Sequence, residues 1–281
     1  MQFLKMHGAG NDFVVIDNVR GDLAATDWTS LARAMCDRHF GIGSDGILVA
    51  ERSAIAPFRM RMFNPDGSES EMCGNGIRCF GKYLYDRGLT DATRVAVETG
   101  AGVLTLDLHV RDGAVSSVTV DMGVPEFRPD RVPVIADGEF ARDCPVEGVG
   151  AAVRVSCVSM GNPHAVMFID QPVVEYALAE VGPRVERHAM FPRRVNFEIV
   201  RQVSPTELEA RVWERGAGLT LACGTGACAI AAVARRHGRI GDDVTVRLPG
   251  GALDIHWDGR GAILMTGPAV LVFEGVWRGT N

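Results

Sequence analysis

The sequence predicts an α+β fold of two pseudo-symmetric, duplicated halves, each with strands wrapped around a central helix. Two observations lead to this prediction. The 281-residue chain repeats its main motifs in the same order. Alternating apolar and polar runs, such as residues 115–122 and 244–248, are typical of half-buried strands, and in each half they accompany one strongly apolar helical run.

The repeat is clearest at two cysteines that stand 150 residues apart. Each is followed by Gly-x-Gly, as Cys73-Gly74-Asn75-Gly76 and Cys223-Gly224-Thr225-Gly226. An alternating run precedes each motif and a helical run follows it. The second helical run, residues 226–237, is apolar nearly all round and therefore belongs in the interior of a domain. We interpret the chain as two duplicated halves, residues 1–123 and 124–267.

Composition and charge exclude several classes of protein. The 29 Lys and Arg residues against 35 Asp and Glu give a net charge of −6 without a basic block, so we expect no nucleic-acid partner. The sequence has no run suited to a signal peptide or a membrane span, so we expect no membrane partner. Seven cysteines, an odd number, argue against a disulfide framework. We therefore expect a cytoplasmic protein with reduced thiols.

Cys73 and Cys223 are the candidate acid–base pair. Each precedes the start of a predicted helix, where unpaired N–H groups and the positive end of the helix dipole favour anions. We expect this position to lower the pKa of both thiols and to let the adjacent glycines hold a carboxylate close to the backbone. If the halves face each other across a cleft, one thiolate removes a proton from one face of a carbon and the other thiol protonates the opposite face. Such a stereochemical inversion needs no cofactor.

Simpler interpretations exist for the cysteines. A buried cysteine most often packs as a small apolar residue, which is our interpretation of Cys36, Cys144 and Cys157. The spacings from Cys73 to Cys79 and from Cys223 to Cys228 are wider than those of usual zinc sites, so we expect no metal. The glycine-rich turns lack the Gly-Lys-Ser/Thr ending of a phosphate loop. The duplication of the motif favours the acid–base interpretation.

Other polar residues recur at the ends of apolar runs. They are Asn11, Asn64, Asn162, Asn196 and the pair Glu214-Arg215. Asn11 corresponds to Asn162 in the repeat, and Asn64 to Glu214, which favours a shared site over isolated turns and caps. Arg215 is suited to binding a second carboxylate on the substrate. His164 either helps to deprotonate a nearby thiol or is a structural histidine.

The motifs resemble those of diaminopimelate epimerases from the first residues to Gly267-Pro268-Ala269. The segments that carry the resemblance are residues 5–13, 63–68, 73–79, 161–164, 195–198, 214–218 and 222–228. The resemblance implies an enzyme independent of pyridoxal phosphate, usually a homodimer, that interconverts LL- and meso-2,6-diaminoheptanedioate in the synthesis of lysine and the bacterial cell wall. It also implies that the C-terminal segment, residues 268–281, packs back on the first half.

The resemblance further implies a role for each site residue. Cys73 and Cys223 are the acid–base pair, and His164 and Glu214 tune catalysis. The helix starts at Gly74, Asn75, Gly224 and Thr225 bind the reacting carboxylate. The residues that hold the rest of the substrate are Asn11, Asn64, Asn162, Asn196, Glu214 and Arg215.

The chain departs from some members of the family at two positions. Gly46 stands where some members have Gln, so a side-chain contact is lost there. Phe273 stands where some members have a Tyr at the dimer contact, so one hydrogen bond of the expected dimer is missing.

Two alternatives to diaminopimelate epimerisation remain open from the sequence. The same chemistry would serve a racemase of another amino acid, such as histidine. A non-catalytic metabolite-binding protein on the same scaffold is the second. The set Asn64, Asn162, Asn196 and Arg215 suits a second amino-acid head and argues against the first alternative, and the retention of both thiols argues against the second.

Overall fold

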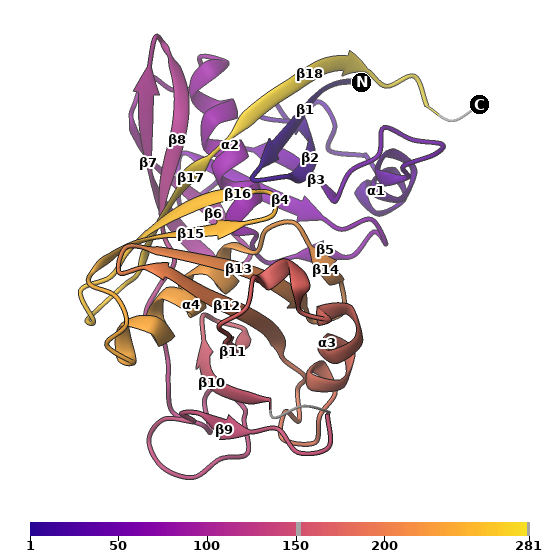
Figure 1. The fold of residues 1–281 in the computed structure, drawn as a ribbon. Coiled ribbons are helices and arrows are strands. Elements are labelled where there is room, and N and C mark those ends of the chain that lie inside the picture. Colours follow the sequence, from indigo (N-terminus) through magenta and orange to yellow (C-terminus); the bar gives the residue numbers. More distant parts are fainter. Residues whose placement is uncertain (150–152, 280–281) are drawn as a thin grey trace. The chain divides into compact units, whose positions relative to one another are not determined.

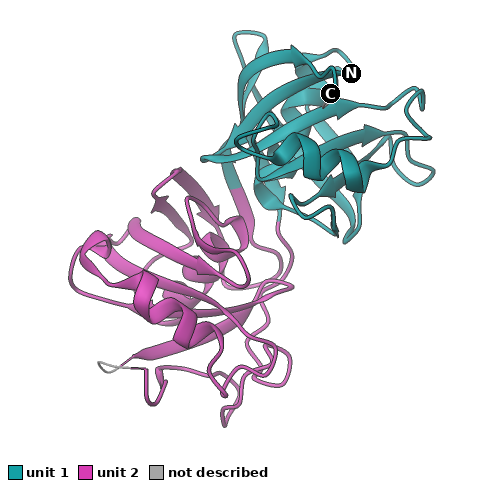
Figure 2. Cartoon of the chain, turned by 90° about the vertical axis from the view of Figure 1, so that its right-hand side faces the viewer, with its two compact units in different colours: residues 1–121, 266–281 teal, residues 122–265 magenta. Residues whose placement is uncertain are grey.

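The computed structural model describes residues 1–149 and 153–279, and the chain divides into two compact units. Unit 1 comprises Met1–Asp121 with Thr266–Asn281, and unit 2 comprises Met122–Met265 (Figure 2). The chain therefore leaves unit 1, builds unit 2, and returns to unit 1. Each unit is described separately below.

Unit 1 surrounds helix α2 with strands (Figure 1). In chain order its elements are β1 (Gln2–Gly8), β2 (Asn11–Asp17), α1 (Trp28–Cys36), β3 (Gly46–Glu51), β4 (Phe58–Phe63), β5 (Glu69–Ser70), α2 (Gly74–Asp86), β6 (Arg94–Thr99), β7 (Gly102–Arg111) and β8 (Ala114–Asp121). The returning chain adds β18 (Val270–Val276), which pairs antiparallel with β1.

Unit 2 repeats this plan around helix α4. Its elements are β9 (Cys144–Pro145), β10 (Arg154–Ser159), β11 (Pro163–Phe168), η1 (Val173–Glu175), α3 (Leu178–Glu186), β12 (Asn196–Ser204), β13 (Glu207–Glu214), β14 (Gly218–Thr220), α4 (Gly224–Arg236), β15 (Asp243–Leu248) and β16 (Gly251–His256). Strand β17 (Leu264–Pro268) carries the chain back to unit 1.

The strand pairings of the two units correspond one to one. In unit 1, β1 pairs antiparallel with β2, β2 parallel with β3, β3 antiparallel with β4, and β4 parallel with β6. In unit 2, β10, β11, β12, β13 and β15 follow with the same sequence of directions. The predicted α+β class with duplicated halves is confirmed.

The central helices are almost fully buried, α4 because it is apolar nearly all round and α2 although it carries Arg78 and Lys82. Every residue of α2 from Gly74 to Leu84 is buried, as is every residue of α4 from Gly226 to Ala234. Both helices have 13 residues and end alike, because Gly88 and Gly238 adopt positive φ angles of 67° and 69° just after the last turn. A left-handed residue at this place lets the following N–H groups satisfy the last carbonyls of a helix.

Two further helices, α1 and α3, were not identified from the sequence. Asp27 is the N-cap residue of helix α1, and its side chain accepts a hydrogen bond from the Ser30 N–H. The helix packs against β3 and β4. Helix α3 has no side-chain cap and contains Pro183, and it packs against β12, β13 and β14. These short helices are held by packing against the sheet more than by local signals.

Candidate active site

In unit 1, the predicted site residues gather around the start of α2. Cys73 is the N-cap residue, with extended backbone angles, and α2 begins at Gly74. The Cys73 thiol donates to Asn11 Oδ1 at 3.6 Å, and Asn75 Nδ2 donates to the same oxygen at 3.1 Å. Asn11 lies at the start of β2, so the loop that opens this strand is joined to the helix start. The structure thus brings together the three predicted residues Asn11, Cys73 and Asn75.

Asp45 fixes the orientation of the Asn11 side chain. Asn11 Nδ2 donates to Asp45 Oδ2 at 2.6 Å. A carboxylate accepts hydrogen bonds only, so the amide nitrogen must face Asp45 and the amide oxygen must face Cys73. Asp45 is itself held by Arg38, whose Nη2 donates to its Oδ1 at 2.8 Å. Sequence reasoning missed Asp45, although its place in the glycine-rich segment 41–46 was a usable signal.

A buried guanidinium, that of Arg78, is hydrogen-bonded to the first turn of α2. Arg78 is fully buried, and its Nη1 donates to the Gly74 carbonyl at 3.0 Å while its Nη2 donates to Asn75 Oδ1 at 2.9 Å. Its Nε donates to the Pro268 carbonyl at 3.3 Å. The returning C-terminal chain is therefore bonded to the helix that carries Cys73.

In unit 2, the predicted site residues gather around the start of α4. Cys223 is the N-cap residue, and its sulfur accepts a hydrogen bond from the Gly226 N–H at 3.3 Å. Thr225 Oγ1 lies 3.4 Å from the same sulfur. The backbone of this helix start repeats that of the first half, as the Cys-Gly-x-Gly motifs predict.

The pKa of the Cys223 thiol differs from the sequence expectation. Burial raises the pKa of this thiol well above its ordinary value, and the carboxylates of Glu214 and Glu198 raise it further. The hydrogen bonds from Thr225 and Gly226 lower it but do not compensate. The expectation that the helix start lowers the pKa is therefore wrong for Cys223, because desolvation and two nearby carboxylates outweigh the helix start.

A chain of hydrogen bonds joins Cys223 to a buried carboxylate. Thr225 Oγ1 accepts from Asn162 Nδ2 at 3.3 Å, and Asn162 Oδ1 lies 3.0 Å from His164 Nε2. His164 Nδ1 lies 2.6 Å from Glu198 Oε1, and both of these side chains are fully buried. The ring nitrogens of His164 thus contact Asn162 and Glu198. Sequence reasoning did not single out Glu198, although a lone acidic residue in an apolar strand was a signal for it.

Glu214, Arg215 and Asn196 meet at the end of β13. Glu214 Oε1 accepts a hydrogen bond from Thr220 Oγ1 at 2.6 Å. Asn196 is buried, donates to the Pro163 carbonyl at 2.8 Å and accepts from the Arg215 N–H at 2.9 Å. Asn196 therefore fixes the backbone at Arg215, and the exposed Arg215 side chain extends to the Arg193 carbonyl at 3.1 Å.

The remaining predicted residues lie close to the same elements. Asn64 begins the loop after β4, where its Nδ2 donates to Ser68 Oγ at 3.0 Å. Gly74 and Gly224 are the buried first residues of α2 and α4. Gly46 is glycine for a steric reason, because a Cβ there would lie 2.8 Å from the Phe63 carbonyl oxygen. This backbone therefore excludes the Gln that some family members carry.

The other cysteines are buried or partly buried. Cys36, Cys79, Cys157 and Cys228 are buried, and burial raises the pKa of Cys79 to about 12. Among residues 1–149 and 153–279, no group of three or more His, Cys, Asp or Glu side chains is placed to hold a metal ion. No helix in these ranges is long and apolar enough to cross a membrane.

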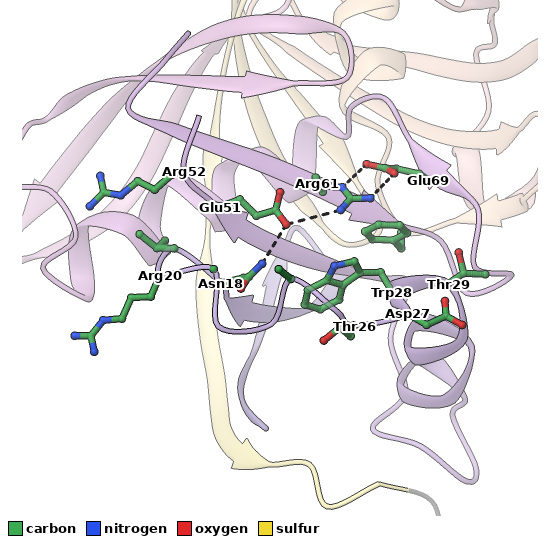
Figure 3. A pocket seen from close by; sticks show the side chains of 14 residues that line it. Asn18, Arg20, Thr26, Asp27, Trp28, Thr29, Glu51, Arg52, Arg61 and Glu69 are labelled. Atoms are coloured by element: carbon green, nitrogen blue, oxygen red, sulfur yellow. Dashed lines mark hydrogen bonds and ion pairs between the residues drawn. The ribbon is translucent and has the colours of Figure 1, made fainter. Parts of the chain in front are cut away.

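Unit 1 has a pocket of about 730 Å³, and Cys73 is not among the residues that line it (Figure 3). Arg61 crosses it and binds Glu69 through two hydrogen bonds of 2.8 Å each. Asn18 donates to Glu51 at 3.2 Å, and Arg61 lies 3.7 Å from the same carboxylate. These side chains satisfy one another, so the pocket gives no reason to assign a ligand to it.

Known structures share this fold. A hydroxyproline epimerase from Agrobacterium vitis is similar with a TM-score of 0.64 at 19% sequence identity, covering 98% of this chain and 91% of that one. A phenazine biosynthesis family protein from Bacillus anthracis is similar with a TM-score of 0.68 at 16% identity, covering 98% of both chains. The chain thus shares its fold with these proteins. In this chain, a cysteine thiol stands at the start of each central helix.

Sequence comparison identifies the family to which the chain belongs. The family model described as diaminopimelate epimerase matches residues 3–128 and 156–272. A diaminopimelate epimerase from Acetivibrio thermocellus is 49% identical over 276 residues, which is 98% of both chains. The chain belongs to the diaminopimelate epimerase family and is an isomerase, which confirms the resemblance seen in the motifs.

The electrostatics of Cys223 give a first testable prediction. Replacing Glu214 by Gln keeps the acceptor for Thr220 but removes a negative charge, so the pKa of Cys223 should fall and its thiolate fraction at about pH 8 should rise. Iodoacetamide should then alkylate Cys223 faster, as followed by peptide mass spectrometry. Glu207→Gln, which changes a partly exposed carboxylate paired with Arg247, is the control. An unchanged or slower rate in Glu214→Gln would show that this carboxylate does not act on the thiol.

Proposed function

We propose that this chain interconverts LL- and meso-2,6-diaminoheptanedioate by a two-thiol proton transfer. Family membership supports the reaction, and the duplicated helix start with its thiol supports the mechanism. One thiolate removes the α-proton, and the other thiol donates a proton to the opposite face of the same carbon. The single observation that carries the mechanism is that Cys73 and Cys223 occupy the same N-cap position in the two units.

We propose that the two helix starts hold the α-carboxylate of the reacting carbon. The backbone N–H groups of Gly74, Asn75, Gly224 and Thr225 lie in the first turns of α2 and α4, where the helix dipoles favour negative charge. As the proton leaves, charge spreads onto this carboxylate, where fixed donors stabilise it without reorganisation. The proton transfer then needs no pyridoxal phosphate or other cofactor.

The distal amino-acid head of the substrate needs its own polar partners. Asn64, Asn162 and Arg215 have partly or fully exposed side chains and remain our candidates, with Asn11 and Glu214 close to the thiols. Asn196 acts by fixing the backbone of Arg215. The family and its relatives do not favour a racemase of another amino acid such as histidine. We place the enzyme in the cytoplasm, in lysine and peptidoglycan precursor synthesis, with this small molecule as its partner.

We also propose that the enzyme is a homodimer that associates through β18. Consecutive side chains of this strand, Val270, Leu271, Val272 and Phe273, are 40–53% exposed. A run of exposed apolar residues on a paired strand is unusual for a monomer. Phe273 stacks edge-on against Phe3 with ring centroids 6.0 Å apart, so the ring that replaces the expected Tyr is held in place on this surface.

The two-thiol mechanism predicts that each thiol is essential. Cys73→Ala and Cys223→Ala should each lower kcat for epimerisation by about 1,000-fold or more, because each removes one of two required acid–base groups. The assay follows the conversion of LL to meso isomer by chiral chromatography, with Cys144→Ala as the control.

The same variants test the non-catalytic alternative. If both alanine variants kept the activity of the parent, the thiols would not carry the reaction. A parent protein that bound diaminopimelate without converting it would identify a binding protein.

The dimer proposal predicts the effect of charge on β18. Val272→Glu places a charge among exposed apolar side chains, so it should shift the protein from dimer to monomer in analytical ultracentrifugation. Val103→Glu, at a similarly exposed position on β7, is the matched control and should leave the dimer intact. A parent protein that sediments as a monomer would contradict the proposal.

A further inference from the structure

The two thiols have different surroundings although their helix starts share one backbone. Strand pairing aligns Phe13 with Gly46 in unit 1 and His164 with Asn196 in unit 2. Two residues further along each pair of strands, Leu48 in unit 1 corresponds to Glu198 in unit 2. The apolar pair Phe13 and Leu48 thus occupies the places that His164 and Glu198 occupy in unit 2.

The third residue of each helix confirms this correspondence. A Cβ added at Gly76 would lie 3.2 Å from Leu48 Cδ2 and 3.5 Å from Cys73 Cβ. A Cβ added at Gly226 would lie 3.3 Å from both Glu198 Oε1 and Cys223 Sγ. Leu48 and Glu198 therefore lie in the same place under the two helix starts.

The proton count of the buried pair follows from its contacts. Asn162 Nδ2 donates to Thr225, so Asn162 Oδ1 faces His164 and must receive a proton from Nε2. The contact of 2.6 Å between His164 Nδ1 and Glu198 Oε1 holds one more proton. Whichever atom carries that proton, it joins two side chains that are both fully buried.

The hydrogen bonds then run in one direction, toward sulfur. His164 Nε2–H donates to Asn162, and Asn162 Nδ2–H donates to Thr225 Oγ1. Because Thr225 Oγ1 accepts this bond, its own hydrogen is free to point at Cys223 Sγ, 3.4 Å away. The Gly226 N–H points at the same sulfur, so both contacts stabilise negative charge on it.

We propose that Glu198 is a positioning residue, which holds His164, Asn162 and Thr225 so that the Thr225 hydroxyl donates to the Cys223 sulfur whenever that sulfur carries charge. The proposal rests on the proposed two-thiol function for its effect on catalysis, but not for its effect on the thiol itself. Burial and two carboxylates raise the pKa of Cys223, and the Thr225 bond opposes them. Without such a bond the buried sulfur would be a poor proton acceptor.

Glu198→Leu gives unit 2 the apolar residue that unit 1 has at this place. It removes the carboxylate at which the series of hydrogen bonds to Cys223 begins. It should lower kcat by about 100-fold in both directions, with KM within about threefold, because proton transfer is misaligned while substrate contacts persist. Glu198→Gln still bonds His164 Nδ1 and should keep kcat within about tenfold of the parent. Glu209→Gln, a carboxylate on the neighbouring strand β13 paired with Arg201, is the control.

Alkylation of Cys223 separates this proposal from the function it rests on. In Glu198→Leu, iodoacetamide should alkylate Cys223 about threefold more slowly or worse, with Cys73 unchanged, because the sulfur loses a directed donor. If Glu198 acted only as a buried negative charge, Cys223 would react faster, and that result would overturn the proposal. A slower rate in a protein without epimerase activity would refute the function and leave the positioning role intact.

Thr225→Val provides a second test of the proposal if Glu198→Leu does not fold. Thr225 is only partly buried, and its loss removes the last donor of the chain. The variant should slow Cys223 alkylation as above, and Thr225→Ser should restore the rate of the parent. If both single variants fold, the double variant should be no slower than either, because both break one chain. Additive effects, or a Thr225→Val that reacts like the parent, would contradict the proposal.

Discussion

Each unit depends on one constraint, a 13-residue helix that is enclosed by strands and has a cysteine as its N-cap residue. An enclosed helix start leaves N–H groups that water cannot reach freely, so the chain has to satisfy them locally or with a ligand. In unit 2 the Cys223 sulfur satisfies one of them directly, through the Gly226 N–H. The start of each central helix is held in place by the surrounding strands, by the loops before β2 and β11, and by the glycines of the motifs.

The two helix starts share one backbone conformation, but the two sulfurs contact different side chains. The Cys73 thiol donates to the amide oxygen of Asn11, a contact that stabilises the protonated sulfur. The Cys223 sulfur receives the Gly226 N–H and lies beside the Thr225 hydroxyl, contacts that stabilise the thiolate. A reaction that takes a proton at one thiol and gives one at the other benefits from such a difference, because proton acceptor and proton donor are required in the same cycle.

Much of this organisation was accessible from the sequence, because duplication makes weak signals strong. The paired Cys-Gly-x-Gly motifs located both helix starts, and the paired Gly-Asn motifs located Asn11 and Asn162. Helices α1 and α3 were missed because they depend on packing against the sheet. Asp45 and Glu198 act through other side chains, so spacing alone could not reveal them. The pKa of Cys223 was predicted in the wrong direction, because the depth of burial and the approach of Glu214 and Glu198 are tertiary properties.

The central claim is that one group removes the α-proton from one face of a carbon and a different group protonates the opposite face. The most direct test is to follow LL-diaminopimelate in D2O at early times, by mass spectrometry after chiral separation. The account predicts that the meso product carries one deuterium at the inverted α-carbon while the remaining LL substrate is still unlabelled, because the donating thiol holds a solvent deuteron. Unlabelled meso product, or label entering the LL substrate as fast as meso product forms, would indicate a single base and contradict the account.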